Sequence, residues 1–247
     1  MLTATATQPR TGVFLTAGWH NLAMLNFVVD PEVLLPYVPA GTTLDSWQGR
    51  TFVTVVGFQF INAKVLGIAL PFHRQFEEVN LRFYVVRQGP DGLRRGVVFL
   101  REIAPKRLVS FVARWFFNEK YVTMPMRQSV KSGLVQYEWW HGGRWNGLSL
   151  RVHGDAKPLV VGTHEEFIAE HYWAYTQQPD GSTMEYQVEH PPWHATPASL
   201  ACYDCDVEAI YGKAFVPYLR EPSSVFVADG SPVIVRRGQG VWANPEA

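Results

Sequence analysis

The chain has few cysteines, no excess of either charge and no long apolar run. Only two of its 247 residues are Cys, which fits a protein of the reducing cytosol. Lys+Arg and Asp+Glu each number 22 with no basic block, so we predict neither a nucleic-acid partner nor a membrane-surface partner. No stretch reaches the roughly 18 apolar residues of a membrane span, and residues 1–10 lack the pattern of a secretory signal. These absences predict a cytoplasmic protein.

Several signatures of catalysis and metal binding are also missing. The chain has no Ser-centred nucleophile elbow, no Gly-rich phosphate loop and no EF-hand loop. Cys202 and Cys205 lack the second pair that a zinc site requires, and their acidic neighbours disfavour a thiolate. His164 and His171 lie roughly 10 Å apart along a helix axis, too far to share one metal. We therefore predict two free thiols, no metal and no cofactor.

What the chain does contain is apolar and aromatic residues in strand-like runs. Hydrophobic residues make up 47% and aromatic residues 14%, enough for a large core. The runs predict strands over 51–60, 79–87, 94–102, 134–141, 144–152, 184–190, 202–211, 224–228 and 233–237. Turn signals predict two hairpins, between 79–87 and 94–102 and between 134–141 and 144–152, and a turn at 230–232.

Three helices complete an α+β, mainly β, fold. A short one starts at Asp30, an N-cap followed by Pro31. A second covers about 105–117 and has one buried apolar stripe. The third opens with a capping box at 163–166 and continues to His171.

The segment 76–85 is the most informative stretch, because its two faces differ. As a strand it points Val79, Leu81, Phe83 and Val85 one way, and Glu78, Asn80, Arg82 and Tyr84 the other. We expect the apolar face to pack on the helix at 105–117. The polar face either meets water or lines a polar cavity inside a closed sheet, where it would begin a site.

Three further positions have alternative interpretations. His190, near Trp193 at a strand end, is either a general base or a loop cap. His171 is expected to be half-buried and hydrogen-bonded. Lys120 follows the long helix, where aromatic neighbours could lower its pKa and make it a nucleophile, but Glu119 opposes that change. Lys120 is otherwise a solvated loop residue.

Several motifs, spread from about Trp19 to Val235, together resemble the YqjF-like bacterial family of unknown function. They are NFVVDP at 26–31, VPAG at 38–41, FEEVNLR at 76–82, RRGV at 94–97, EHYWAY at 170–175 and EYQVEHP at 185–191. That family is placed in the acetoacetate decarboxylase-like superfamily. The resemblance implies one domain over 1–247, with 1–12 a flexible arm, folded as a curved, largely closed antiparallel β-barrel with a few short helices. It also implies a cavity of small-molecule size and allows a homo-oligomer.

The decarboxylase itself uses a Schiff-base lysine whose pKa is lowered by an adjacent lysine. In the alignment implied by the resemblance, that lysine falls at or beside Tyr121, and this chain has no Lys-Lys pair. An acid of the decarboxylase cavity corresponds to Glu78. We therefore predict that the cavity is retained and that imine formation is not.

The predicted function is to bind a small carbonyl or carboxylate metabolite in the barrel. If the protein is an enzyme, we expect lyase-like acid/base chemistry, with Glu78 or His190 as base and Tyr121 as acid or hydrogen-bond donor. Arg82 or Arg101 would anchor an anion. The expected substrate-binding residues are Asn80, Arg82, Arg101, Lys120, His171 and Trp193. The alternative is a non-catalytic structural or oligomer-interaction protein with a filled barrel.

Overall fold

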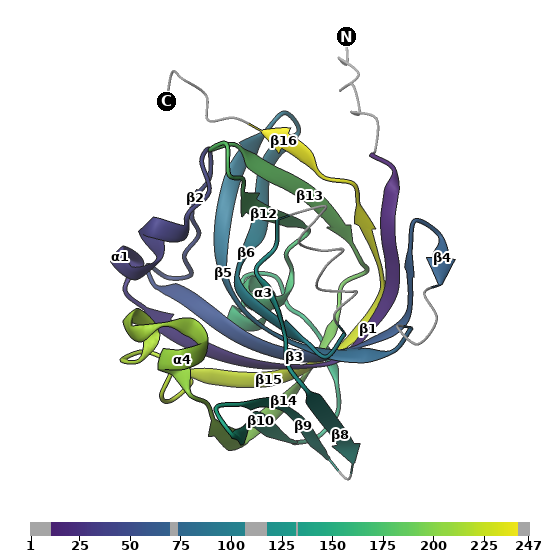
Figure 1. Cartoon of the computed structure of the whole chain (residues 1–247), viewed down its shortest axis with the longest axis vertical. Helices are drawn as coiled ribbons and strands as arrows, with labels where there is room; N and C mark the ends of the chain where they lie inside the picture. Colours follow the sequence, from purple (N-terminus) through teal and green to yellow (C-terminus); the bar gives the residue numbers. More distant parts are fainter. Residues whose placement is uncertain (1–10, 70–73, 107–117, 132, 242–247) are drawn as a thin grey trace.

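A ring of β-strands forms the centre of the molecule (Figure 1). The structure is a computed structural model, and it describes residues 11–69, 74–106, 118–131 and 133–241. The ring consists of β1 (Val13–Val29), β3 (Thr51–Val65), β5 (Phe76–Gly89), β6 (Gly92–Ala104), β12 (Trp173–Gln177), β13 (Thr183–Glu189) and β15 (Ser224–Arg236). Strands far outnumber helices, which confirms the α+β, mainly β, class.

Pairing between β13 and β15 closes the ring. The strand order is β13-β12-β6-β5-β3-β1-β15, and Val188 and Glu189 of β13 then pair with Val235 and Ile234 of β15. Every neighbouring pair in the ring is antiparallel except β12 and β6, which are parallel. The ring is thus antiparallel as expected, apart from this one pair. A parallel pair requires a long crossover, and here the connection between β6 and β12 includes β8 to β10.

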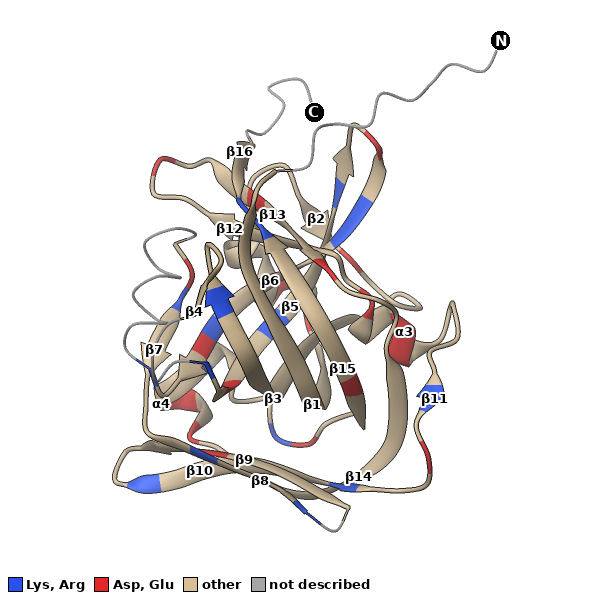
Figure 2. Ribbon diagram, turned by 90° about the vertical axis from the view of Figure 1, so that its right-hand side faces the viewer, with Lys and Arg blue, Asp and Glu red and all other residues tan. Residues whose placement is uncertain are grey.

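A second layer of strands packs on the outside of the ring (Figure 2). It consists of β8 (Met126–Lys131), β9 (Leu134–His141), β10 (Arg144–Val152) and β14 (His194–Asp204). Tyr137 and Trp139 of β9 share one buried core with Leu81 and Phe83 of β5. The apolar face of β5 is buried as expected. Its expected partner, the helix at 105–117, lies almost entirely outside the described residues, and the partners found are this outer layer and α4 (Val207–Tyr211).

The short elements lie around these layers. They are α1 (Pro31–Leu34), η1 (Leu35–Tyr37), β2 (Thr43–Leu44), β4 (Ile68–Ala69), β7 (Tyr121–Thr123), β11 (Lys157–Pro158), α3 (His164–Ala169), η2 (Lys213–Phe215) and β16 (Gln239–Val241). The side chains of Asp30 and Thr163 cap α1 and α3 as predicted. However, α3 ends at Ala169, so His171 follows the helix. Among the described residues, no helix combines the length and apolarity needed to cross a membrane.

Most predicted strands are confirmed, including both hairpins, and two predictions are wrong. The strand expected over 202–211 ends at Asp204, because Asp206 caps α4 by accepting from the Ala209 amide. The turn expected at 230–232 is absent, because β15 continues through it beside β1. Gly230 has φ 79° there, so it bends the strand without ending it.

Only the last two residues of the expected N-terminal arm are described. The carbonyls of Thr11 and Gly12 accept hydrogen bonds from Arg236 and Arg237. Residues 1–10 lie outside the described part.

Candidate functional site

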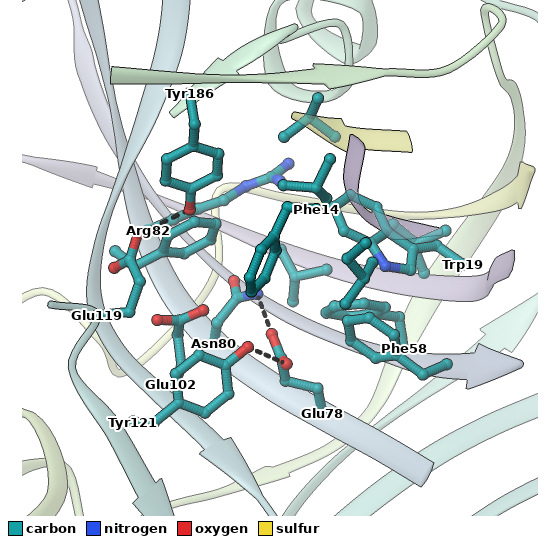
Figure 3. Close-up of a pocket in the computed structure, with 17 residues that line it drawn as sticks. Phe14, Trp19, Phe58, Glu78, Asn80, Arg82, Glu102, Glu119, Tyr121 and Tyr186 are labelled. Atoms are coloured by element: carbon teal, nitrogen blue, oxygen red, sulfur yellow. Dashed lines mark hydrogen bonds between the residues drawn. The ribbon is translucent and has the colours of Figure 1, made fainter. Parts of the chain in front are cut away.

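The ring encloses a cavity of about 100 Å³ whose lining is divided between apolar and polar side chains (Figure 3). The apolar lining is Phe14, Leu15, Trp19, Leu22, Val56, Phe58, Phe60, Phe99, Val188 and Val235. The polar lining is Glu78, Asn80, Arg82, Glu102, Glu119, Tyr121 and Tyr186. Such a volume is several times the roughly 10–15 Å³ that a cavity needs to hold one water molecule, so a small organic molecule can fit in it.

The alternating pattern of β5 places its polar face in this cavity. Glu78, Asn80 and Arg82 are only 2%, 3% and 7% exposed, and all three line the cavity. The sequence left open whether this polar face meets water or lines a cavity, and in the structure it lines the cavity. Asn80 donates from Nδ2 to Glu78 Oε1 at 3.2 Å and pairs across the sheet with Glu102 of β6.

Two phenols bind two of the buried carboxyls. Tyr121 donates its hydroxyl to Glu78 Oε2 at 2.6 Å, and Tyr186 donates to Glu119 Oε1 at 2.7 Å. Thr176 also donates to Glu119 Oε1, at 2.6 Å. Burial raises the pKa of both tyrosines well above the usual value, so both phenols remain hydrogen-bond donors.

Burial makes the three carboxyls of the cavity weak acids. It raises the pKa of Glu78 to about 7, although hydrogen bonds from Tyr121 and Asn80 lower it. It also raises the pKa of Glu119 to about 7, against hydrogen bonds from Thr176 and Tyr186. The pKa of Glu102 is well above its usual value because of burial and then the charges of Glu119 and Glu78. Two groups that titrate near neutrality can both accept and release protons under physiological conditions.

Arg82 is a buried cation in the same cavity. It donates from one guanidinium nitrogen to the Ile168 carbonyl at 3.0 Å, and its guanidinium carbon lies 5.8 Å from the centre of the Tyr84 ring. Among the described residues, its Nε has no hydrogen-bond partner and no carboxylate forms an ion pair with it. A buried guanidinium without a counterion is unfavourable, so this position favours an anionic ligand.

Glu119 is a site residue that the sequence analysis treated only as a neighbour of Lys120. Residues 118–121 lead into β7, where alternation turns Glu119 and Tyr121 into the cavity and Lys120 away from it. Lys120 is exposed, and its Nζ lies 5.2 Å from the centre of the Tyr37 ring. Partial burial lowers the pKa of Lys120, with Glu119 opposing the change and Arg101 adding to it. Strand alternation counted back from Tyr121 would have identified Glu119.

The other predicted site residues also lie outside the cavity lining. Arg101 pairs with Leu81, on the face of the sheet that turns away from Asn80 and Glu102. The ring of His190 stacks between Tyr172 and Trp193, with centroids 4.7 and 4.2 Å away.

The remaining two residues, Trp193 and His171, are buried in the core. Trp193 donates from Nε1 to Ser231 Oγ at 2.9 Å. His171 is buried, with its ring centre 4.7 Å from that of Tyr84, and burial and then Arg95 and Arg82 hold its pKa well below the usual value. The predicted set therefore divides into Glu78, Asn80, Arg82 and Tyr121, which the cavity brings together, and five residues that it does not include.

Neither thiol lies in the cavity. Cys202 is exposed and Cys205 half-buried, both as free thiols, and burial raises the pKa of Cys205 to about 12. Within the described ranges, no group of His, Cys, Asp and Glu side chains is arranged to hold a metal. The cavity itself contains a buried cation and three weakly acidic carboxyls.

Comparisons with known proteins agree with this fold. Residues 16–232 match the DUF2071 family, described as "Uncharacterized conserved protein (COG2071)". Over 182 residues, 71% of this chain and 72% of its relative, the sequence is 25% identical to "Uncharacterized protein YqjF" of Bacillus subtilis (strain 168).

Solved structures of the same architecture are more distant in sequence. An acetoacetate decarboxylase-like enzyme from Sphingomonas wittichii RW1 matches with a TM-score of 0.63 and 13% identity over 98% of each chain. The enduracididine biosynthesis enzyme MppR complexed with pyruvate matches with a TM-score of 0.63 and 14% identity, over 96% of this chain and 93% of that one. The chain therefore belongs to the DUF2071 family, is YqjF-like, and has the acetoacetate decarboxylase-like fold.

Proposed function

We propose that this protein binds a small organic carboxylate in the ring cavity and transfers a proton to or from it at a carbonyl-bearing part of the ligand. One observation carries the proposal: Arg82, a buried cation with no carboxylate partner among the described residues, shares a cavity of about 100 Å³ with three weakly acidic carboxyls. A related fold gives further support, since MppR has been solved in complex with pyruvate, a small oxo acid.

The cavity residues suggest a division of roles. Arg82 holds the ligand carboxylate through charge-assisted hydrogen bonds. Glu78 acts as the general base, because a pKa of about 7 leaves a substantial fraction ionised at neutral pH. Glu102, whose pKa burial and the charges of Glu119 and Glu78 raise well above its usual value, forms part of the polar wall that the ligand faces. Tyr121 orients Glu78 through its 2.6 Å hydrogen bond.

The proposed chemistry excludes an imine. A Schiff-base lysine must reach the ligand carbonyl, and Lys120 is not part of the cavity lining. The alternative function, a structural protein with a filled barrel, is not favoured, because space remains between the polar and apolar linings of the ring.

Isotope exchange tests both binding and proton transfer. Acetoacetate, pyruvate and 4-oxopentanoate are incubated with the protein in D2O, and NMR follows the loss of the signals from protons next to the carbonyl. Calorimetric titration of the same compounds measures binding. We expect protein-dependent exchange, a loss of at least ten-fold in Glu78→Gln, and loss of binding in Arg82→Gln. Lys120→Ala, outside the cavity, is the matched control and should behave like the wild type. Binding without exchange would leave a carrier role, and no binding of any oxo acid would contradict the proposal.

Three broader features belong to the same proposal: one domain over 1–247, a cytoplasmic location and self-association. The single domain is supported by the pairing of β1 with β15, which joins the two ends of the chain in one ring. Light scattering after size-exclusion chromatography measures the assembly state.

A further inference from the structure

Three oxygen atoms in the cavity wall receive no hydrogen bond from an N–H or hydroxyl donor of the described residues. They are Asn80 Oδ1, Glu102 Oε2 and Glu119 Oε2. Their side chains are 3%, 3% and 5% exposed, respectively. Glu102 and Glu119 hydrogen-bond to each other, which requires a proton on one of the two carboxyls. Buried polar atoms are almost always hydrogen-bonded, so these oxygens and Asn80 Oδ1 together suit a ligand group that brings several donors.

The three acceptors come from neighbouring segments. Asn80 of β5 and Glu102 of β6 are direct cross-strand partners. The Glu102 amide donates to the Lys120 carbonyl at 3.2 Å, which fixes Glu119 next to Glu102. Figure 3 shows Asn80, Glu102 and Glu119 on one side of the cavity, opposite Trp19 and Phe58. All three side chains therefore face the same region of the cavity.

An ammonium group fits this set of acceptors. It has three N–H donors and no acceptor, whereas a hydroxyl has one donor and brings acceptor lone pairs of its own. In the part of the chain that the structure describes, no lysine or arginine forms an ion pair with Glu78, Glu102 or Glu119. The carboxyl cluster therefore lacks a cation of its own.

Arg82 lies close enough to bind the other end of the same molecule. It is two residues beyond Asn80 on the inner face of β5, roughly 7 Å along the strand. We infer that the ligand is a small amino carboxylate, with its ammonium against Asn80, Glu102 and Glu119 and its carboxylate on Arg82. This inference rests on the proposed function and names the substrate class of that site.

Binding of an ammonium should also release protons. Burial raises the pKa of both Glu102 and Glu119, the charges of Glu119 and Glu78 raise that of Glu102 further, and Lys120 only partly opposes the change at Glu119. A positive charge against them favours their ionised form. The heat of binding near pH 6.5 should then depend on the ionisation enthalpy of the buffer.

Two matched pairs of probes test the inference by calorimetry. Each pair differs by one amine: butanoate with 4-aminobutanoate, and 4-oxopentanoate with 5-amino-4-oxopentanoate. We expect the amino member of at least one pair to bind ten-fold or more tightly than its partner, with proton release. In Glu102→Gln and Glu119→Gln that preference should fall below about three-fold while binding of the plain carboxylate persists. Glu138→Gln, in the outer layer, is the control, and thermal melts confirm folding of each variant.

The outcomes distinguish failure of the ammonium subsite from failure of the carboxylate site on Arg82. Equal affinities within both pairs for the wild type, together with loss of binding in Arg82→Gln, would overturn the ammonium subsite and keep the carboxylate site. An amine preference that survives in both Gln variants would also overturn the subsite. If none of the four compounds binds the wild type, both the inference and the proposed function are contradicted.

Discussion

Glu119 and Lys120 are adjacent in sequence but lie on opposite sides of the ring wall. Glu119 is 5% exposed and lines the cavity, whereas the Nζ of Lys120 lies 5.2 Å from the centre of the Tyr37 ring, away from the lining residues. The carboxyl of Glu119 therefore lies in the cavity, and the amine of Lys120 lies outside it. The direction of these two side chains determines which chemistry is available to the site.

Lys120 should not form an imine with oxo acids. Treatment with borohydride in the presence of acetoacetate or pyruvate should give no reduced adduct on Lys120, because the amine cannot reach a carbonyl bound in the cavity. Peptide mapping by mass spectrometry provides the measurement. An adduct on Lys120 that disappears in Lys120→Ala would restore a decarboxylase-type mechanism.

Glu119 should make folding stability depend on pH. Burial raises its pKa from 4.5 to about 7, so the folded chain holds this proton more tightly than the unfolded chain does. Its stabilising effect is therefore complete below about pH 4.5 and is lost as the pH rises through 7. A shift of this size corresponds to an upper limit on the order of 3 kcal/mol. Urea unfolding at pH 5 and pH 8 should show a smaller loss of stability in Glu119→Gln than in the wild type. Equal losses would mean that Glu119 does not titrate in this range.

Removing the hydroxyl of Tyr121 should raise the pKa of Glu78 further. The hydrogen bond from Tyr121 is the strongest influence that lowers this pKa. In Tyr121→Phe, the midpoint of the Glu78 carboxyl titration, followed by ¹³C NMR with Glu78→Gln for assignment, should move above 7. Loss of the bond should also cost about 1 kcal/mol of stability. Tyr186→Phe is the matched control, because its hydroxyl binds Glu119 instead. A Glu78 midpoint unchanged in Tyr121→Phe would show that this hydrogen bond is not made in solution.

Gly230 should tolerate substitution far less than Gly143. Both have positive φ, 79° and 76° respectively. A Cβ on Gly230 would lie 2.0 Å from the Trp19 carbonyl oxygen, whereas nothing lies within 4 Å of one on Gly143. Gly143→Ala should therefore lower the free energy of unfolding by only roughly 1 kcal/mol, the cost of placing a residue with a Cβ in the left-handed conformation. Gly230→Ala should lower it several times more, because its Cβ also clashes with Trp19. Thermal and urea unfolding of the two variants provide the comparison, and similar losses would contradict the close approach of β15 to β1.

The parts of the fold that sequence patterns could predict are local ones. The hairpin of β9 and β10 follows from alternation around Gly142-Gly143, and its strands begin and end at the predicted residues. The polar face of β5 could be identified, but whether it met water or a cavity depended on ring closure, which is a long-range property. The sequence around Gly230 predicted a turn, but packing against Trp19 makes this glycine a bend within β15.

The site could be predicted in part for the same reason. Glu78, Asn80 and Arg82 share one strand, so local alternation groups them. Glu102 and Glu119 join them through pairing of β6 with β5 and β7, which no local pattern specifies. His171 and His190 were predicted from their local sequence context, but both rings pack in the core outside the cavity lining, beside Tyr84 and Trp193 respectively, where burial lowers the pKa of both imidazoles.

Closure of the ring has a consequence for synthesis of the protein. The cavity is lined by Phe14 and Leu15 of β1 and by Val235 of β15, which pairs with Leu15 although it comes more than 200 positions later in the sequence. While the polypeptide emerges from the ribosome, β1 and β3 can pair, but the last wall of the chamber is still untranslated. Ligand binding should thus begin only after β15 has been synthesised and has paired with β1, and a small molecule bound in the cavity should stabilise this last pairing of strands.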